Sequence, residues 1–399
     1  MREIPGVAID FRSPEIQKNP YPAYDYLLKN HPVFKLPDDR VGICRHADVL
    51  FALNNQELFT VGSPTVVDPD WKEEKRGMFI LTQDNPAHDL NKAVVNKAFV
   101  SRVLRQLEGF MRQRATSLLN ETKGKHIEFF QGFGYPYANS ILGAILGTAD
   151  TQDRHMEQVY RWIELLEQPD LDRPEDERVH ETNAAYKYLG NWYVELTAER
   201  RKHPRNDLIT ALIEAEVEGK PLTENDVFGA IDLFLIAGFQ STAQFLASTL
   251  LFLAENGDIL ARLKENQAEI PGFIEEMLRF GGTAHAVLRI ARTNVELHGY
   301  IIPEGTLVAI FLAAANRDPL VFENPEKFIL GRSNVRRQIG FGAGHHACIG
   351  AALARLEVKI ALEIILSECD KIACPAYSDV EWLQTPTTRG AKSLPIVFS

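Results

Sequence analysis

Apolar residues recur three and four positions apart along most of the chain, which is the spacing of a buried face on an α-helix. This pattern predicts helices over residues 93–110, 160–166, 186–196, 227–253 and 349–366. Shorter apolar runs bounded by Gly, Pro, Asp or Asn predict strands over residues 6–11, 41–45, 294–311 and 394–399. The sequence therefore predicts a mainly α fold with a minor β-sheet region, one strand of which is the C-terminal segment.

One of these helices is long and unusually apolar. It follows Thr223–Asp226, a stretch that resembles a capping box, and it ends before residues 255–257. Residues 233–254 approach transmembrane length, but their centre at residues 240–244 is polar and no basic cluster flanks them. We therefore expect a buried core helix and no membrane association.

Composition narrows the class of protein. The chain has 399 residues, and no repeat or linker divides it, so we expect a single domain over residues 1–399. With 43 Lys and Arg against 54 Asp and Glu, its net charge of -11 argues against nucleic-acid binding. The four cysteines form no CxxC pair and the first residues lack a signal-peptide pattern, so we expect a reducing, cytoplasmic compartment.

One cysteine has a distinctive setting. The stretch IGFGAGHHACIG, residues 339–350, places Cys348 behind two histidines in a loop with four glycines, directly before an amphipathic helix. A helix N-terminus favours a thiolate, and a thiolate among backbone N–H groups is how cysteine holds haem iron. A zinc site built from His345, His346 and Cys348 is the alternative, but no second cluster with zinc-type spacing exists in the sequence.

The chain resembles the cytochrome P450 haem-thiolate monooxygenases of the soluble bacterial type. The resemblance rests on this loop and on further motifs, which occur in the family's order along nearly the whole chain. The haem loop FxxGxxxCxG is matched by Phe341, Gly344, Cys348 and Gly350. Glu276 and Arg279 match the ExxR pair, which by spacing alone would be a surface pair. Arg332 matches the third member of the family's buried salt-bridge cluster. The resemblance implies the P450 fold, with the haem between the long oxygen-activating helix and the Cys-loop helix.

The resemblance also implies the cofactor and the residues that bind it. Cys348 would be the proximal ligand of a haem b, and its electron donation would favour O–O cleavage. The other positions that match haem contacts of the family are His88, Lys92, Arg289, Phe341, Gly342, His346 and Gly350. Lys92 stands where the family typically has arginine, and lysine supplies the charge without the bidentate fork.

The oxygen-activating helix departs from the family pattern Ala/Gly-Gly-x-acid-Thr, because the stretch 237–241 reads AGFQS. Gly238 and the hydroxyls of Ser241 and Thr242 remain as candidate catalytic groups, whereas the amide of Gln240 cannot relay a proton. Three outcomes stay open: monooxygenation with protons delivered by water or a substrate hydroxyl, slower turnover that releases peroxide, or a peroxide-driven or non-oxygenating reaction such as isomerisation. We favour the first because Ser241 keeps a hydroxyl.

The electrons must come from a partner, since no flavin or nicotinamide fingerprint follows a strand. The resemblance implies a ferredoxin served by an NAD(P)H-dependent ferredoxin reductase, and a monomeric enzyme. A basic cluster of Lys92, Lys97, Arg337 and Arg355 is the candidate docking surface. The alternative for this cluster is a solvated cationic face with no partner.

The resemblance places the substrate pocket along several segments, including the loops at residues 61–77 and 167–177. Its candidate side chains are Phe234, Ala237, Ala284, His285, Ala286, Val287 and Leu288. They are mostly small and apolar, which favours hydroxylation of a bulky lipophilic substrate such as a steroid, terpenoid or polyketide. His285 would bind either a polar group of the substrate or a haem propionate. Other functions that stay open are a haem-thiolate peroxygenase or isomerase and a non-catalytic haem-binding protein.

Overall fold

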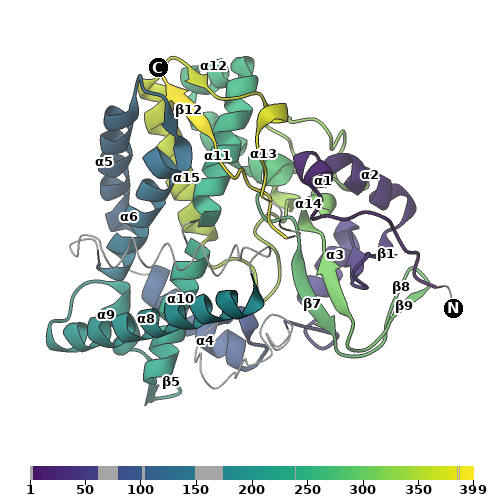
Figure 1. The fold of residues 1–399 in the computed structure, drawn as a ribbon, viewed down its shortest axis with the longest axis horizontal. Coiled ribbons are helices and arrows are strands. Elements are labelled where there is room, and N and C mark those ends of the chain that lie inside the picture. Colours follow the sequence, from purple (N-terminus) through teal and green to yellow (C-terminus); the bar gives the residue numbers. More distant parts are fainter. Residues whose placement is uncertain are drawn as a thin grey trace. The chain divides into compact units, whose positions relative to one another are not determined.

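The computed structural model describes residues 3–61, 80–100, 104–148, 174–238, 240–383, 385 and 387–399. Contacts divide the chain into two units. The first unit comprises Met1–Gly62, Met111–Tyr137 and Ser241–Ser399, and the second comprises Ser63–Phe110 and Ala138–Gln240. Both units are mainly helical, and the small sheets stand out in Figure 1. The predicted fold class is therefore confirmed.

The helices and strands have the following bounds. The α-helices are α1 Pro14–Lys18, α2 Tyr21–Asn30, α3 His46–Asn54, α4 Ala87–Val100, α5 Leu104–Thr122, α6 Tyr135–Leu146, α8 Glu175–Lys202, α9 Leu208–Ile213, α10 Glu224–Gly238, α11 Gln240–Glu255, α12 Gly257–Glu265, α13 Ile270–Gly281, α14 Leu312–Ala315 and α15 Ala351–Glu368. The strands are β1 Val33–Lys35, β2 Val41–Ile43, β3 Phe59–Thr60, β4 Ile127–Glu128, β5 Glu216–Val217, β6 Lys220–Pro221, β7 Val287–Ala291, β8 Val295–Leu297, β9 Tyr300–Ile302, β10 Leu307–Ile310, β11 Ile372–Ala373 and β12 Pro395–Phe398.

Most of the predicted elements are present. The helix predicted over residues 93–110 is divided between α4 and α5, residues 186–196 lie within α8, and the C-terminal strand is β12. The segments 160–166, 62–77 and 167–173 lie outside the described residues.

The strand predicted over residues 6–11 is wrong. Only Gly6 pairs there, through a single bridge to Lys35. The partner strand β1 ends at Lys35, because the chain turns back where the amide of Leu36 donates to the carbonyl of Arg40 (2.8 Å). Residues beyond Val7 therefore have no strand to pair with.

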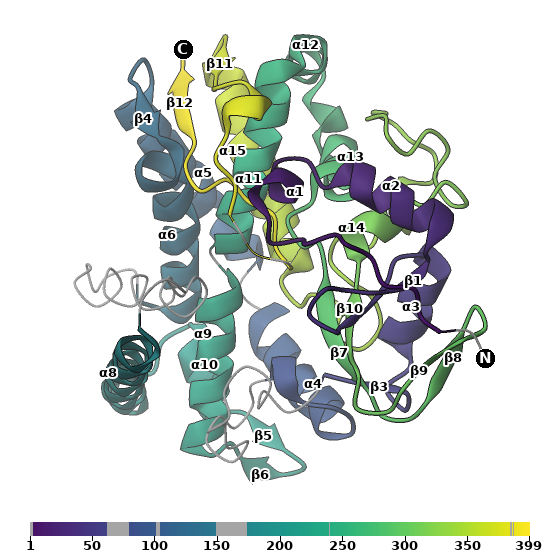
Figure 2. The same cartoon turned by 45° about the vertical axis from the view of Figure 1, so that its right-hand side comes forward.

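A five-stranded sheet in the first unit positions several candidate residues. Its order is β1-β2-β10-β7-β3, with β10 parallel to β2 and the other pairs antiparallel. Phe34 of β1 lies over Gly42 of β2, where a Cβ would come within 2.2 Å of the ring. Glycine at this position allows the ring to cover the strand. In the same sheet Arg289 of β7 pairs with Val308 of β10, which fixes the register of β7. Strands β7 and β10 lie side by side in Figure 2.

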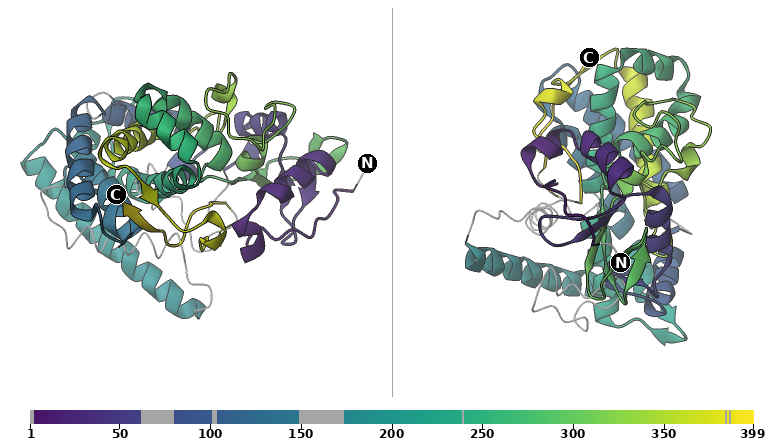
Figure 3. Two further views of the ribbon diagram at one scale, coloured as in Figure 1. Left: turned by 90° about the horizontal axis from the view of Figure 1, so that it is seen from above. Right: turned by 90° about the vertical axis from the view of Figure 1, so that its right-hand side faces the viewer.

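The helices of the first unit include α11, α13 and α15, which are labelled in Figure 2. The yellow-green helix α15 can also be found in the two views of Figure 3. Helix α13 packs against α15, and Thr242 of α11 bonds to Glu357 of α15. A second sheet, of order β11-β12-β4, includes the C-terminal strand. Helix α15, which follows the Cys348 loop, is therefore held against both other helices.

The second unit contains α8, α9 and α10. Within it, the hydroxyl of Tyr193 donates to Asp232, which links α8 to α10. The predicted capping box is confirmed, since the amide of Thr223 donates to Asp226 (2.9 Å) and the amide of Asp226 donates to Thr223 Oγ1 (3.2 Å). This exchange satisfies two backbone donors where α10 begins.

Residues Glu224–Glu255, which are α10 and α11 on either side of residue 239, are long and apolar enough to cross a membrane. Within the protein, however, 65% of their 18-residue apolar window is buried. Burial of this kind is typical of a core helix in a globular protein.

Candidate active site

Backbone contacts hold the Cys348 loop. The amide of Cys348 donates to the carbonyl of Phe341 (2.9 Å), and the amide of Ala347 donates to Gly344 (3.1 Å). Gly344 has a φ of 70°, and a Cβ at this position would lie 2.3 Å from the carbonyl oxygen of Leu53. Only glycine tolerates both this φ and this approach. The backbone of Leu53 therefore packs directly against this loop.

The thiol of Cys348 is exposed, unlike the other three. Burial raises the pKa of the thiols of Cys44, Cys369 and Cys374, which makes them poor ligands. Cys348 stands just before α15, whose N-cap is Gly350, and the first N–H groups of a helix have no partner within it. Of the four cysteines, Cys348 is the one placed to act as a ligand.

A buried ion cluster fixes the segments behind this loop. Glu276 accepts hydrogen bonds from Arg279 (2.9 and 2.7 Å) and from Nε of Arg332 (3.0 and 3.2 Å). All three side chains are buried, and backbone carbonyls accept from the remaining N–H groups. Arg279 also donates to the carbonyl of Asn316 (3.1 Å), whose side chain accepts from the amide of Ile339 (2.8 Å). The cluster is thus joined to the start of the Cys348 loop.

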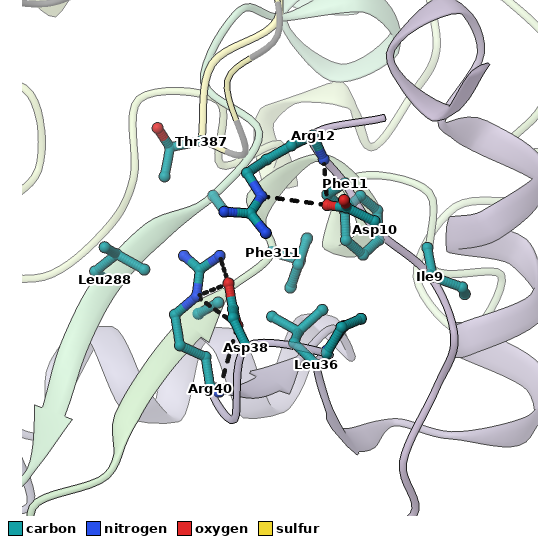
Figure 4. Close-up of a pocket in the computed structure, with 13 residues that line it drawn as sticks. Ile9, Asp10, Phe11, Arg12, Leu36, Asp38, Arg40, Leu288, Phe311 and Thr387 are labelled. Atoms are coloured by element: carbon teal, nitrogen blue, oxygen red, sulfur yellow. Dashed lines mark hydrogen bonds and ion pairs between the residues drawn. The ribbon is translucent and has the colours of Figure 1, made fainter. Parts of the chain in front are cut away.

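Strand β7 separates the residues predicted to line one pocket. Side chains alternate along a strand, so Val287 and Arg289 lie on one face and Leu288 on the other. Val287 packs against the core cluster formed with β2 and β10, whereas Leu288 packs against a different cluster. In Figure 4, Leu288 borders a small pocket with Arg12 and Arg40, each paired with an aspartate. Val287 and Leu288 therefore have different surroundings, and their places in the substrate pocket stay predictions.

The ring of His285 is bonded within the protein. Its Nδ1 lies 2.8 Å from the hydroxyl of Tyr24, and a backbone group of Gly282 bonds to the ring. Burial, with the cations of Arg389 and Arg317 nearby, lowers the pKa of His285 well below its usual value. The ring is therefore neutral near pH 7. These contacts support neither of the two roles predicted for His285, and its role stays a prediction.

The start of α11 holds the residues predicted to activate oxygen. Gln240 is partly buried and Ser241 is exposed, while Thr242 is buried. The hydroxyl of Thr242 bonds to the carboxyl group of Glu357 on α15, and no hydrogen bond reaches Glu357 Oε2. Burial raises the pKa of Glu357 to about 8, although the bond from Thr242 acts in the opposite direction. A protonated carboxylic acid therefore stands beside Thr242 near neutral pH.

Sequence reasoning missed Glu357. Helix α15 has an apolar stripe, and Glu357 lies on it, four residues after Leu353 and four before Ala361. All three side chains are buried. An acid on the apolar face of a helix is the signal that would have identified it, because a buried carboxyl group without a cation is rare.

In the second unit, α4 carries two of the predicted haem contacts. His88 is buried and its Nδ1 bonds to Asp89 (2.8 Å), while Lys92 is partly buried one helical turn later. Residues four apart share a helix face, so His88 and Lys92 are presented together. On α10, Phe234 is buried and Ala237 is exposed at the end of the helix.

The residues predicted to dock a partner have different surroundings. Lys97 and Arg337 are exposed. Arg355, in contrast, forms two hydrogen bonds with Glu275 (2.5 and 3.0 Å) and lies over the ring of Phe341, 4.6 Å from its centre. Burial acts to raise the pKa of Glu275, but the hydrogen bonds from Arg355 and a neighbouring amide outweigh it and lower the pKa. Arg355 thus braces the loop, and its charge is balanced.

The residues of the first unit fit a haem held by a cysteine. An exposed residue, Cys348, stands at a helix N-terminus, Gly342 in its loop has open space where a Cβ would stand, and buried Arg289 supplies a cation. His346 and Gly342 lie in the same loop and are partly buried. In the described part of the chain, no three His, Cys, Asp or Glu side chains gather as a metal site, so the zinc alternative has no support.

Comparisons with known proteins agree with this geometry. A family model described as "Cytochrome P450" matches residues 15–390. "Cytochrome P450 109" of Bacillus spizizenii is 32% identical over 384 residues, which are 94% of this chain and 91% of that protein. The solved structure of cytochrome P450 CYP109Q5 from Chondromyces apiculatus has a TM-score of 0.89 at 28% identity and covers 98% of both chains. CYP109E1 from Bacillus megaterium, solved in complex with corticosterone, has a TM-score of 0.85 at 26% identity and covers 96% of this chain and 99% of that one.

Proposed function

Since the chain belongs to the cytochrome P450 family of monooxygenases, we propose that it inserts one oxygen atom of O2 into a C–H bond of a lipophilic small molecule. The observation that carries this proposal is the exposed thiol of Cys348 in its glycine loop before α15. A haem b bound to this thiolate supplies the activation of O2, which electron donation from the cysteine favours. We propose that residues 1–399 form one catalytic domain.

Residues of this chain would hold the cofactor in three ways. Cys348 provides the thiolate, and the loop around Phe341 and Gly342 is braced by Arg355. Arg289, with Lys92, offers cationic groups for the propionates, and charge-assisted hydrogen bonds to carboxylates are strong. His88, His346 and Gly350 are the remaining candidates for contacts with the haem.

Proton delivery in this proposal uses Glu357 in place of an acid at position 240. The carboxyl group of Glu357 is protonated near pH 7 because burial raises its pKa to about 8, and a group with a pKa near the working pH both releases and regains a proton. As its proton moves to the oxygen of Thr242, the hydroxyl of Thr242 would release its own proton to a water that the hydroxyl of Ser241 orders at the start of α11. Gln240 bonds to that water or to the substrate, and Gly238 marks the end of α10.

A peroxide-driven reaction is the second candidate, and Gln240 is the observation that favours it. If the path from Glu357 is too slow, oxygen supplied as peroxide bypasses the need for that proton. Product formed from peroxide without any ferredoxin would favour this candidate.

The substrate class rests on the apolar side chains of the predicted pocket, Phe234, Ala237, Ala284 and Val287, and on the relative solved with corticosterone. We propose a steroid, terpenoid or polyketide. Electrons would come from a ferredoxin and its NAD(P)H-dependent reductase, with docking at Lys97 and Arg337, which are exposed. A cytoplasmic, monomeric enzyme fits this arrangement.

The test is a titration of the ferric holoenzyme with steroids, sesquiterpenes, fatty acids, macrolides and small aromatic acids, followed at the Soret band. A ligand that displaces water from the iron shifts the band to shorter wavelength. Ligands that shift it are then assayed for product with ferredoxin, reductase and NAD(P)H, or with peroxide alone. Tight binding of a steroid, terpenoid or macrolide and a hydroxylated product that needs ferredoxin are expected. A preference for small aromatic acids would contradict the substrate class.

A test of the proton path compares two variants in the same assay. Glu357→Gln should lower coupling of product to NAD(P)H consumption, whereas Gln240→Glu should preserve or raise it. Unchanged coupling in Glu357→Gln would refute the path through Glu357. The substrate proposal would be unaffected by that result.

A further inference from the structure

The first unit contains a second cavity, of about 460 Å³, that shares no residue with the candidate haem and substrate sites. Its walls are the start of α2, the end of α11, the end of α13 and the side chains of Arg317, Tyr377, Trp382 and Arg389. Ligand pockets of this kind occupy about 300–1,000 Å³ and combine aromatic walls with a few polar groups. The size of the cavity is therefore that of a site for a small organic molecule.

Two buried cations face this cavity. Arg317 lies between the rings of Tyr21 (3.6 Å to its centre) and Phe280 (4.6 Å). Arg389 lies over the ring of Trp382 at 3.3 Å. The arginines are 4% and 5% exposed. Stacking on aromatic rings offsets part of the cost of burying each charge.

The hydrogen-bonding capacity of these groups is mostly unused. Arg317 donates to the carbonyl of Phe280 (3.0 Å) and Arg389 to the carbonyl of Lys18 (2.9 Å). The Nε atoms of both arginines and the indole N–H of Trp382 have no partner, and no carboxylate of the described residues pairs with either guanidinium. Buried cations without a counterion are unfavourable. Arg317 and Arg389 thus line the cavity as buried cations, and no carboxylate of the described residues pairs with them.

The acids that line the cavity do not fill this role. Glu255 and Glu326 are exposed, and Asp25 is partly exposed. Glu255 accepts a hydrogen bond from the amide of Tyr377 (2.6 Å). The carboxylates therefore lie toward solvent, and they disfavour ligands with more than one negative charge.

We propose that this cavity binds an organic monoanion that has a flat aromatic body and one carboxylate. The carboxylate pairs with the guanidinium groups of Arg317 and Arg389, which line the cavity, while the aromatic body packs against Tyr377 and Phe280. The proposal uses residues apart from the candidate haem site, so it does not depend on the monooxygenase function.

The experiment measures binding of 2-naphthoate and of its neutral analogue 2-naphthamide to the holoenzyme by isothermal titration calorimetry. Excess imidazole occupies the iron, and the Soret band is recorded to show that the haem site does not respond. We expect one naphthoate per chain and binding of the amide that is weaker by at least about tenfold, because a charged acceptor bonds more strongly than a neutral one. Equal binding of both probes, or no saturable binding of naphthoate, would overturn the proposal.

Variants locate the probe. Arg389→Gln should weaken naphthoate binding about tenfold or more, because it removes a cation that pairs with the carboxylate. Trp382→Phe should weaken binding about threefold, because a smaller ring supports the guanidinium of Arg389 less well. Glu326→Gln should strengthen binding about twofold by removing a repulsive charge, whereas Glu265→Gln, a change at another exposed glutamate, should have no effect. If Arg389→Gln fails to fold, the other three variants still test whether naphthoate binds in this cavity. Binding that responds to none of them refutes this location.

Discussion

Replacing Glu357 with glutamine should remove one specific part of the pH dependence of stability. The pKa of this carboxyl group is raised from 4.5 to about 8 in the folded protein, chiefly by burial. Between these values the folded state keeps a proton that the unfolded chain has released. Stability therefore falls as pH rises through this window. A shift of this size corresponds to about 3 to 5 kcal/mol, lost in full only above the folded pKa.

The assay is denaturant unfolding of the holoenzyme and of Glu357→Gln at about pH 5 and about pH 8. These pH values lie within the range between the unfolded and the folded pKa of Glu357. The parent should lose more stability than the variant over this range, and haem release on unfolding contributes equally to both if their haem affinities match. Infrared difference spectra should show a carboxylic acid band that disappears in the variant and titrates near pH 8. Equal pH dependence of the two proteins, or a band that titrates near 4.5, would refute the reasoning.

Glu363→Gln on the same helix is the matched control. Burial acts to raise the pKa of Glu363, but hydrogen bonds from Lys359 and Arg112 outweigh it and lower the pKa. Its contribution to stability is present above the usual carboxyl pKa and is lost as pH falls. Glu363→Gln should therefore change the pH dependence of the free energy of unfolding only at acidic pH.

Three further predictions concern the loop, the capping box and the docking surface. Gly344→Ala should speed the loss of haem to an acceptor globin. At a φ of 70° the added Cβ would meet the carbonyl of Leu53, at a cost of about 1–3 kcal/mol. An unchanged rate of haem loss would contradict this. Thr223→Ala should lower the free energy of unfolding by about 1 kcal/mol, and Thr223→Ser should restore it, as thermal melts would show. Arg337→Glu should raise the KM for ferredoxin about tenfold at low ionic strength, whereas Arg355→Lys should alter stability and leave that KM unchanged. Equal effects on KM would show that the pairing of Arg355 does not withdraw it from docking.

The sequence identified groups whose partners are near in the chain or belong to a specific motif. The Cys348 loop and the Glu276 pair could be found because glycine spacing and the ExxR pattern are local. Arg355 was predicted as a docking residue from its charge alone, whereas its pairing with Glu275 on another helix could not be foreseen. Similarly, the partner of Glu357 is Thr242 on another helix. Pairings of this kind depend on how helices pack, which one-dimensional spacing does not contain.

Secondary structure was likewise predictable where it depends on neighbouring residues and not where it depends on distant ones. The capping box at the start of α10 involves four consecutive residues, so it could be read directly. The strand at residues 6–11 failed although its composition was suitable, because a strand also needs a neighbour of matching length. Burial of His285 against Tyr24 likewise follows from the packing of α2, which no pattern near residue 285 indicates.

Because side chains alternate along β7, neighbouring positions on this strand cannot be altered as if they were one site. Substitutions at Val287 and at Leu288 alter different packing clusters, although the residues are adjacent, so a library that varies both mixes two separate effects. Inserting or deleting one residue before β7 would exchange the two sets and move the cation of Arg289 to the opposite face. Loop lengths near this strand are therefore free to change only where the register against Val308 of β10 is kept. Variation at Val287 alone is the direct way to reshape the pocket predicted for the substrate.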